Sequence, residues 1–454
     1  MRNVAIFNIY NLCKEISKYK PNKSAKISPS SQSFNGVFLL KPTITPNAGV
    51  LFEIVRYLPK AAVESICFVK GKDLSCNFYK FLNNIKQILL FDYENCTLYG
   101  YTMEKVNKNL VEIKIVKVDL CCAQESIIFN FLIGYFDKNP ESDPIETLYI
   151  SALNQRHLLI ITPNIPHYPT KIAKIIDIES KEEIPINPYL FEEHDIFEIA
   201  DLKVIQKHKN KKYILIKTGR ICSFEKRNFY NSHSNHYKDK IETLIVAPVE
   251  DVLDEAISQK KIDFSKYIIA TAGKNQTVEF ESFINVDNIL ASITATNLPF
   301  ILYSKENFSK GSIEIFKFDL ENKATYKLIS FGGKKPFIYC DDKGYFFIEA
   351  NYSDLSNSNL QKLALEKIYL ENDQRTKVEI IIEEDEIFEN LYSCSSASFI
   401  TTKNVLKEEI KVYFLDEKES YFTTKFYEGF VPIFNTVKDE IKAFIIYPYY
   451  VINR

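Results

Sequence analysis

Residues 334–386 read KKPFIYCDDKGYFFIEANYSDLSNSNLQKLALEKIYLENDQRTKVEIIIEEDE, and this stretch decides the fold. Four runs rich in Phe, Ile, Tyr and Val are separated by short polar breaks. The runs are Pro336–Cys340, Tyr345–Asn351, Leu363–Leu370 and Thr376–Ile382. Aromatic and β-branched residues suit a pleated, half-buried surface, so each run favours a strand. The stretch therefore predicts an up-and-down meander of four antiparallel strands.

The polar breaks support this prediction. Gly344 ends the first break and can supply the positive φ that a tight hairpin needs. The third break, residues 371–375, contains Asn and Asp, whose side chains bond their own backbone in turns. A four-stranded meander cannot bury both of its faces alone, so it must stack against similar units.

Similar meanders recur from about residue 286 to the end of the chain, at a drifting period of about 40–55 residues. This period is typical of β-propellers, and the resemblance is to the architecture of diverged propellers only. We predict an all-β fold, a diverged β-propeller of roughly six to eight four-stranded blades with a few helical insertions. Two β-sandwich-like domains are the alternative that the irregular spacing leaves open.

The sequence also predicts a domain organisation. Residues 1–35 should form an N-terminal arm or short helix followed by a mobile loop, and 36–454 the propeller. The last repeat has only two strands, so strands near the N-terminus should complete it and close the propeller. Residues 219–261 look like an insertion containing a helix at 248–261, which begins with Pro and two acids. A second short helix is expected at 77–86.

Composition limits the function classes. The net charge of −2 provides no global field for binding nucleic acid or membranes. The nine cysteines are scattered, which favours free thiols in a reducing compartment. No run reaches the length of a membrane span, and the N-terminus lacks a signal peptide pattern. We expect a soluble, cytoplasmic protein, with signal-less secretion left open.

The segment 207–240 is the most basic part of the chain, and aromatic residues interleave with its lysines and arginines. It also contains the pair of histidines in HSNH, for which a solvated loop is a better interpretation than a metal site. We expect the long insertion 219–240 and the helix 248–261 to contact a protein partner. The candidate partner-binding residues are Arg227, Phe229, Tyr230, His233, His236 and Tyr237.

No catalytic or cofactor motif is present in the sequence: GxSxG, GxGxxG and the P-loop are all absent. No catalytic, cofactor or metal residue is therefore named, and an enzyme is not favoured. The acidic run at 383–386 is interpreted as gatekeeping charge beside a β-prone strand.

These observations lead us to expect a non-catalytic interaction platform, a scaffold subunit of a larger intracellular assembly with protein partners. One alternative is a propeller hydrolase or lyase with a central carboxylate or His site. A second is a single-stranded nucleic-acid binder that uses segment 207–240.

Overall fold

A computed structural model describes most of the regular elements of the chain. The described residues are 5–8, 38–44, 50–56, 62–69, 76–92, 95–107, 110–134, 149–161, 173–189, 196–206, 211–221, 240–259, 261–273, 275–281, 299–332, 338–340, 345–354, 359–369, 372, 374–394, 397–404, 406–407, 409–415, 421–424, 429–435, 440–447 and 450–451.

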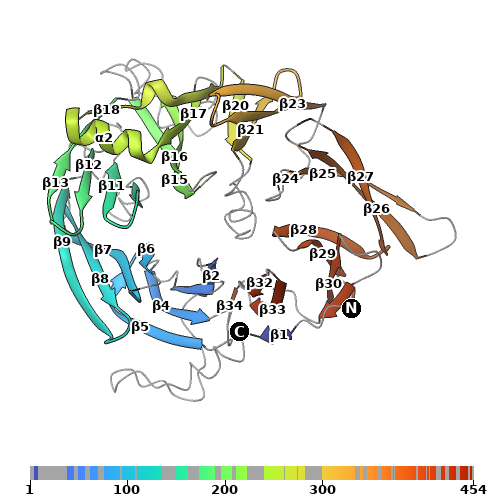
Figure 1. Ribbon diagram of the computed structural model, residues 1–454, viewed down its shortest axis with the longest axis horizontal. Coiled ribbons are helices and arrows are strands. Elements are labelled where there is room, and N and C mark those ends of the chain that lie inside the picture. Colours follow the sequence, from blue (N-terminus) through green and yellow to red (C-terminus); the bar gives the residue numbers. More distant parts are fainter. Residues whose placement is uncertain are drawn as a thin grey trace. The chain divides into compact units, whose positions relative to one another are not determined.

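The chain divides into two compact units. Unit 1 comprises Met1–Gln87, Asn285–Ala295 and Pro336–Arg454, and unit 2 comprises Ile88–Ile284 and Thr296–Lys335. Most sheets of each unit are antiparallel meanders whose strands follow one another along the chain, as Figure 1 shows by colour.

Unit 2 contains four four-stranded sheets among its described residues. The first is β6 (Gln87–Asp92), β7 (Thr97–Asn107), β8 (Leu110–Asp119) and β9 (Gln124–Gly134). The second is β10 (Tyr149–Ala152), β11 (His157–Ile161), β12 (Ala173–Asp177) and β13 (Glu183–Pro185). The third is β15 (Ile196–Gln206), β16 (Lys212–Ile221), β17 (Lys240–Pro248) and β19 (Ile268–Thr271). The fourth is β20 (Gln276–Phe280), β21 (Phe300–Asn307), β22 (Ser312–Asp319) and β23 (Ala324–Gly332).

Three short elements and a helix accompany the third sheet. The helix α2 (Val249–Gln259) follows β17 directly, and the 3₁₀ turn η4 (Phe264–Tyr267) leads into β19. Between them β18 (Lys261–Asp263) pairs in parallel with β14 (Asn187–Tyr189). Within the segment 219–261, which the sequence predicted to be an insertion, Lys240–Pro248 form β17, a central strand of the sheet. The helix expected at 248–261 is present as α2.

Unit 1 contains the predicted meander. It is the sheet β24 (Ile338–Cys340), β25 (Tyr345–Asp354), β26 (Leu360–Tyr369) and β27 (Arg375–Glu383), in that order. A second meander follows: β28 (Glu386–Cys394), β29 (Ala397–Asn404), β30 (Glu409–Phe414) and β31 (Tyr421–Thr424).

The two ends of the chain share sheets in unit 1. Strand β1 (Ala5–Asn8) pairs in parallel with β33 (Glu440–Tyr447), which also pairs with β32 (Gly429–Asn435). The other sheet has the order β34 (Tyr450–Val451), β2 (Phe38–Ile44), β3 (Val50–Arg56), β4 (Ala62–Val69) and β5 (Cys76–Ile85). Ala5–Asn8, within the predicted N-terminal arm or short helix, form β1, and the helix expected at 77–86 is wrong because β5 occupies this segment.

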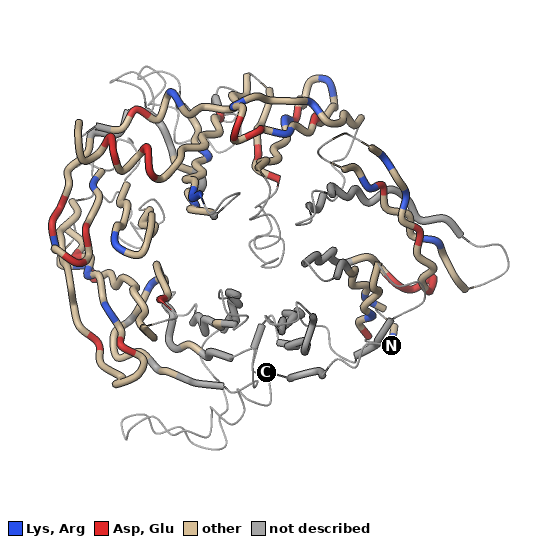
Figure 2. The backbone as a smooth tube through the Cα atoms, viewed as in Figure 1, with Lys and Arg blue, Asp and Glu red and all other residues tan. Residues whose placement is uncertain are grey.

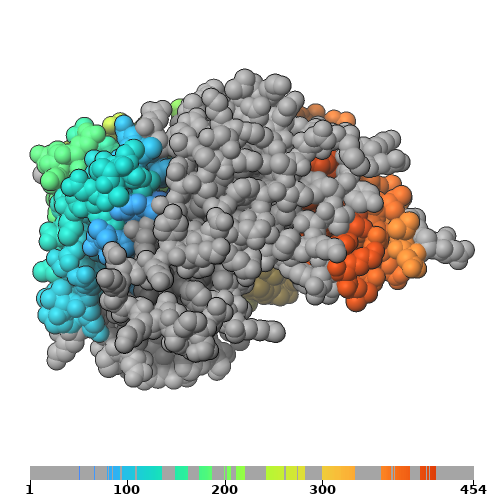
Figure 3. Space-filling model, turned by 90° about the horizontal axis from the view of Figure 1, so that it is seen from below, coloured from blue at the N-terminus to red at the C-terminus, as the bar shows by residue number. Residues whose placement is uncertain are grey.

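The core forms where consecutive sheets pack face to face. Leu158 and Ile160 of β11 contact the β6–β9 sheet, whereas their neighbours Leu159 and Ile161 belong to the core shared with the β15–β19 sheet. A strand buried on both faces has a continuous apolar run instead of an alternating one. The sequence HLLII of β11 has this property. Figure 3 shows a solvent-exposed surface of β7–β9, in cyan and teal.

Glu386, the last residue of the acidic run at 383–386, is bonded within the β28–β31 sheet. The Glu386 side chain is fully buried, and its Oε2 accepts hydrogen bonds from Thr402 Oγ1 and Tyr413 OH, both at 2.8 Å. Its Oε1 is ion-paired with the buried Lys411 of β30. Glu386 therefore joins the β28–β31 strands internally, and the gatekeeping interpretation is wrong for this residue.

The fold class is all-β, of the β-propeller type. Local four-stranded meanders stacked in sequence order are the blade arrangement, whereas β-sandwiches connect two sheets by Greek-key crossovers. The alternative of two sandwich-like domains does not fit these sheets. No helix of the described residues is long and apolar enough to cross a membrane.

Candidate functional site

The six predicted partner-binding residues, Arg227 to Tyr237, lie outside the described residues, which omit 222–239. The same gap contains four of the five aromatic residues of segment 207–240, but only three of its ten lysines and arginines. Within the part that the structure describes, no group of three or more His, Cys, Asp or Glu could hold a metal ion.

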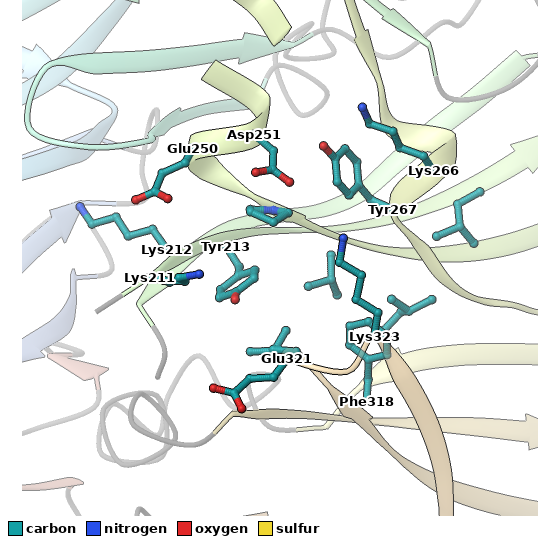
Figure 4. Close-up of a pocket in the computed structure, with 15 residues that line it drawn as sticks. Lys211, Lys212, Tyr213, Glu250, Asp251, Lys266, Tyr267, Phe318, Glu321 and Lys323 are labelled. Carbon is teal, nitrogen blue, oxygen red and sulfur yellow. The ribbon is translucent and has the colours of Figure 1, made fainter. Parts of the chain in front are cut away.

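A polar cleft of about 620 Å³ lies between the β15–β19 and β20–β23 sheets of unit 2, beside the N-terminal end of α2 (Figure 4). This volume suits a small-molecule ligand. Its charged and phenolic lining residues are Lys211, Lys212, Tyr213, Glu250, Asp251, Lys266, Tyr267, Glu321 and Lys323. Sequence reasoning did not select any of them as site residues.

Helix α2 positions two of the carboxylates. Val252 and Ala256 are buried and fix the helix on the core of unit 2. Glu250 and Asp251 are in the first turn, where the helix dipole favours negative charge, and both side chains are exposed to the cleft. The acidic turn of α2 is visible as red backbone in Figure 2.

The third carboxylate comes from the turn between β22 and β23. Asp319 Oδ1 accepts hydrogen bonds from the backbone N–H groups of Glu321 at 2.9 Å and Asn322 at 3.1 Å. Lys323 completes this turn with a φ of +50°. The turn thus presents Glu321 and Lys323 to the cleft, and in Figure 4 Glu321 lies across Tyr213 from Glu250 and Asp251.

Tyr213 lies between these carboxylates. It is near the start of β16, pairs with Pro248 of β17 and is only 8% exposed. Burial raises the pKa of the phenol, and the carboxylates of Asp251, Glu321 and Glu250 raise it further. Tyr213 therefore stays protonated at neutral pH and can donate a proton or hydrogen bond into the cleft.

Tyr267 has a structural role in the wall of the cleft. Its hydroxyl donates to Glu255 Oε1 at 2.8 Å, and the same carboxylate is ion-paired with Lys266. Burial raises the pKa of Tyr267, and the hydrogen bond to Glu255 raises it further. The ion pair with Glu255 leaves Lys266 less available to a ligand than the other lysines of the lining.

Lys212 has a different environment. It is half-buried, and burial alone lowers the pKa of its ammonium group. No ion pair connects Lys211, Lys212 or Lys323 to another residue in the portion of the chain that the structure describes.

No family model matches the chain, and no curated protein matches it in sequence. Solved structures resemble it in fold. Dipeptidyl peptidase 4 of Porphyromonas gingivalis has 8% identity and a TM-score of 0.46, over 85% of this chain and 52% of that protein. The chain thus spans about half of the peptidase. The β-propeller domain of the trilobed protease of Pyrococcus furiosus has 11% identity and a TM-score of 0.37, over 85% of this chain and 95% of that domain. An oligogalacturonate lyase, in complex with manganese, has 10% identity and a TM-score of 0.36, over 80% of this chain and 84% of that protein.

These comparisons contradict the expected non-catalytic platform. The three proteins are, by name, a peptidase, a domain of a protease and a lyase. The scaffold prediction is therefore not carried further.

Proposed function

We propose that this protein is a hydrolase or lyase that acts on a hydroxyl-rich small substrate in the cleft of unit 2. The observation that carries the proposal is the placement of carboxylates from two sheets around one buried phenol. Glu250 and Asp251 come from α2, Glu321 comes from the β22–β23 turn, and all three act electrostatically on Tyr213.

Such an arrangement suits proton transfer to and from oxygen. In glycoside hydrolysis, one carboxyl group protonates the leaving oxygen while a carboxylate on the other side activates water or attacks the sugar. In an elimination, a carboxylate can take the proton from the carbon while a protonated phenol gives its proton to the leaving oxygen. Tyr213 and Glu321 are the residues that we assign to these proton transfers, with Asp251 on the opposite wall.

The lining also favours a substrate that carries hydroxyl groups. Carboxylates accept hydrogen bonds from hydroxyls, and the rings of Tyr213, Tyr267 and Phe318 provide apolar surface between the polar groups. Saccharides combine these two properties, so we propose a saccharide as the substrate class.

The test is turnover of a panel of glycosides and polysaccharides by the full chain and its variants. Tyr213→Phe and Glu321→Gln should each lower kcat by about 10²-fold or more, because each removes a proton-transfer group. Asp254→Asn is the matched control, since Asp254 is exposed on α2 and does not line the cleft. Turnover that survives both cleft substitutions undiminished would refute the assignment.

Two expectations from the sequence stay predictions. Contact with single-stranded nucleic acid through segment 207–240 predicts salt-sensitive retention on an oligonucleotide column. A cytoplasmic location is the other, and fractionation of the source cells would test it.

A further inference from the structure

The buried lysines among the described residues each have a partner. Lys174 Nζ lies 3.0 Å from Glu183 Oε2, and Lys411 Nζ lies 2.7 Å from Glu383 Oε1. Lys317 Nζ lies over the ring of Phe300, 4.9 Å from its centroid. A desolvated ammonium group is costly unless such a partner compensates it.

Lys212 departs from this pattern. It is half-buried at the edge of the cleft, yet nothing in the described part of the chain pairs with it. Burial lowers the pKa of its ammonium group. The side chain is therefore partly desolvated, with no ion-pair partner among the described residues.

Two further lysines have no ion pair within the described ranges and line the same cleft. Figure 4 shows Lys211 and Lys212 on one side of Tyr213 and Lys323 on the other. Lys266 differs from them because Glu255 already neutralises it. A negative group on a ligand would offset the free energy lost when Lys212 is desolvated. It would also accept charge-assisted hydrogen bonds from the ammonium groups.

We propose that Lys212, with Lys211 on the same side of Tyr213, forms a subsite for an anionic group of the substrate. The substrate is then an acidic saccharide, whose hydroxyls face the carboxylates and whose negative group faces the lysines. This inference rests on the proposed function for the location of the substrate, and it adds the charge that the substrate carries.

The test compares an acidic saccharide with its neutral isostere. The probes are oligogalacturonate and the same oligomer with its carboxylates methyl-esterified, and binding to the full chain is measured by isothermal titration calorimetry at low and high salt. Wild type should bind the acid at least about tenfold more tightly than the ester, and salt should weaken this preference. A sulfated neutral oligomer serves as a third probe and distinguishes a carboxylate from a sulfate as the recognised group.

Lys212→Met should remove the preference for the acid, whereas Lys310→Met should keep it, because Lys310 is exposed in the β21–β22 turn outside the cleft. Lys212→Met should also be at least as stable as wild type, since it removes an uncompensated charge. Equal binding of acid and ester by wild type, binding of no anionic probe, or an unchanged preference in Lys212→Met would each overturn the proposal.

These outcomes are distinct from failure of the proposed function. Turnover of neutral saccharides that depends on Tyr213 and Glu321, without a preference for the acid, would overturn the anionic subsite alone. Binding of the acid that depends on Lys212, without turnover of any substrate, would support the subsite and refute the enzyme.

Discussion

Asp177 illustrates how one residue can fix a turn. Its Oδ2 accepts a hydrogen bond from Arg156 Nε at 2.7 Å, and its Oδ1 accepts from the backbone N–H groups of Glu179 at 3.0 Å and Ser180 at 3.3 Å. The side chain is almost fully buried at the end of β12. The bond from Arg156 is the main reason why the pKa of this carboxyl is far below its ordinary value.

A lowered pKa in the folded state means that Asp177 stabilises the fold when it is ionised. This contribution is complete above the unfolded carboxyl pKa of about 4 and is lost as the pH falls below it. Asp177→Asn should lower the free energy of unfolding at pH 7 by about 2–3 kcal/mol. Urea unfolding at pH 7 and pH 3 should show the difference from wild type shrinking at the lower pH. A difference that is constant or grows on acidification would contradict this account.

At the scale of elements, patterns within one meander were sufficient for prediction. The four runs between 336 and 382 correspond to β24, β25, β26 and β27 in order. Their polar breaks and β-rich runs are local signals, and each strand pairs with the next along the chain. A prediction from neighbouring residues succeeds where the contacts are also between neighbours.

The segment 77–86 shows why the same reasoning failed elsewhere. Its apolar residues suit a helix or a strand, and pairing with β4 decides for the strand β5. Tyr79 and Phe81 contact each other with ring centroids 5.4 Å apart, as residues i and i+2 on one strand face do. Leu82 is consequently 82% exposed. The local sequence does not indicate a tertiary contact of this kind.

The cleft could not be predicted for a related reason. Tyr213, Asp251 and Glu321 belong to a strand, a helix and a turn that are far apart in the sequence. The acids of α2 were recognised only as a helix start, which they also are. Only the packing of two sheets brings these residues together.

Helix α2 lies beside the cleft, and substitutions on it test how much its buried face contributes to stability. Val252→Ala should lower the stability of unit 2 by about 2–3 kcal/mol, because it removes two buried methyl groups and leaves a cavity. Ile257→Ala is the matched control on the same helix, since Ile257 is 57% exposed and Ala is the better helix former. Urea unfolding of both variants checks this expectation, and an equal loss in both would contradict the assigned helix face.

At the scale of the whole molecule, both ends of the chain contribute strands to unit 1. The parallel register of β1 with β33 extends from Ala5 opposite Ala443 to Asn8 opposite Ile446. Strand β34 pairs with β2 in a second sheet, with Phe38 opposite Val451. These pairings bridge more than four hundred positions of sequence, so their loop-closure entropy is among the largest in the chain.

Removal of residues 1–9 tests the contribution of the β1 pairing. Amide hydrogen exchange of β33 should accelerate in the truncated chain, because one neighbour of this strand is lost. Exchange in β8, a central strand of unit 2, should stay as it is in the full chain and serves as the internal control. Unchanged protection of β33 would show that β1 contributes little to this sheet.

The discontinuity of unit 1 has a consequence for biosynthesis. Nearly all of unit 2 is contiguous and leaves the ribosome before residue 336, whereas unit 1 needs segments from both ends of the chain. Domains generally fold as units during translation, so unit 2 should be able to fold while the polypeptide is still growing. Strand β1 and one edge of β2 must stay unpaired until β33 and β34 have been synthesised. Exposed edges of this kind are sites of aggregation, and the nascent chain is therefore a natural client for chaperones that protect its N-terminal strands during that interval.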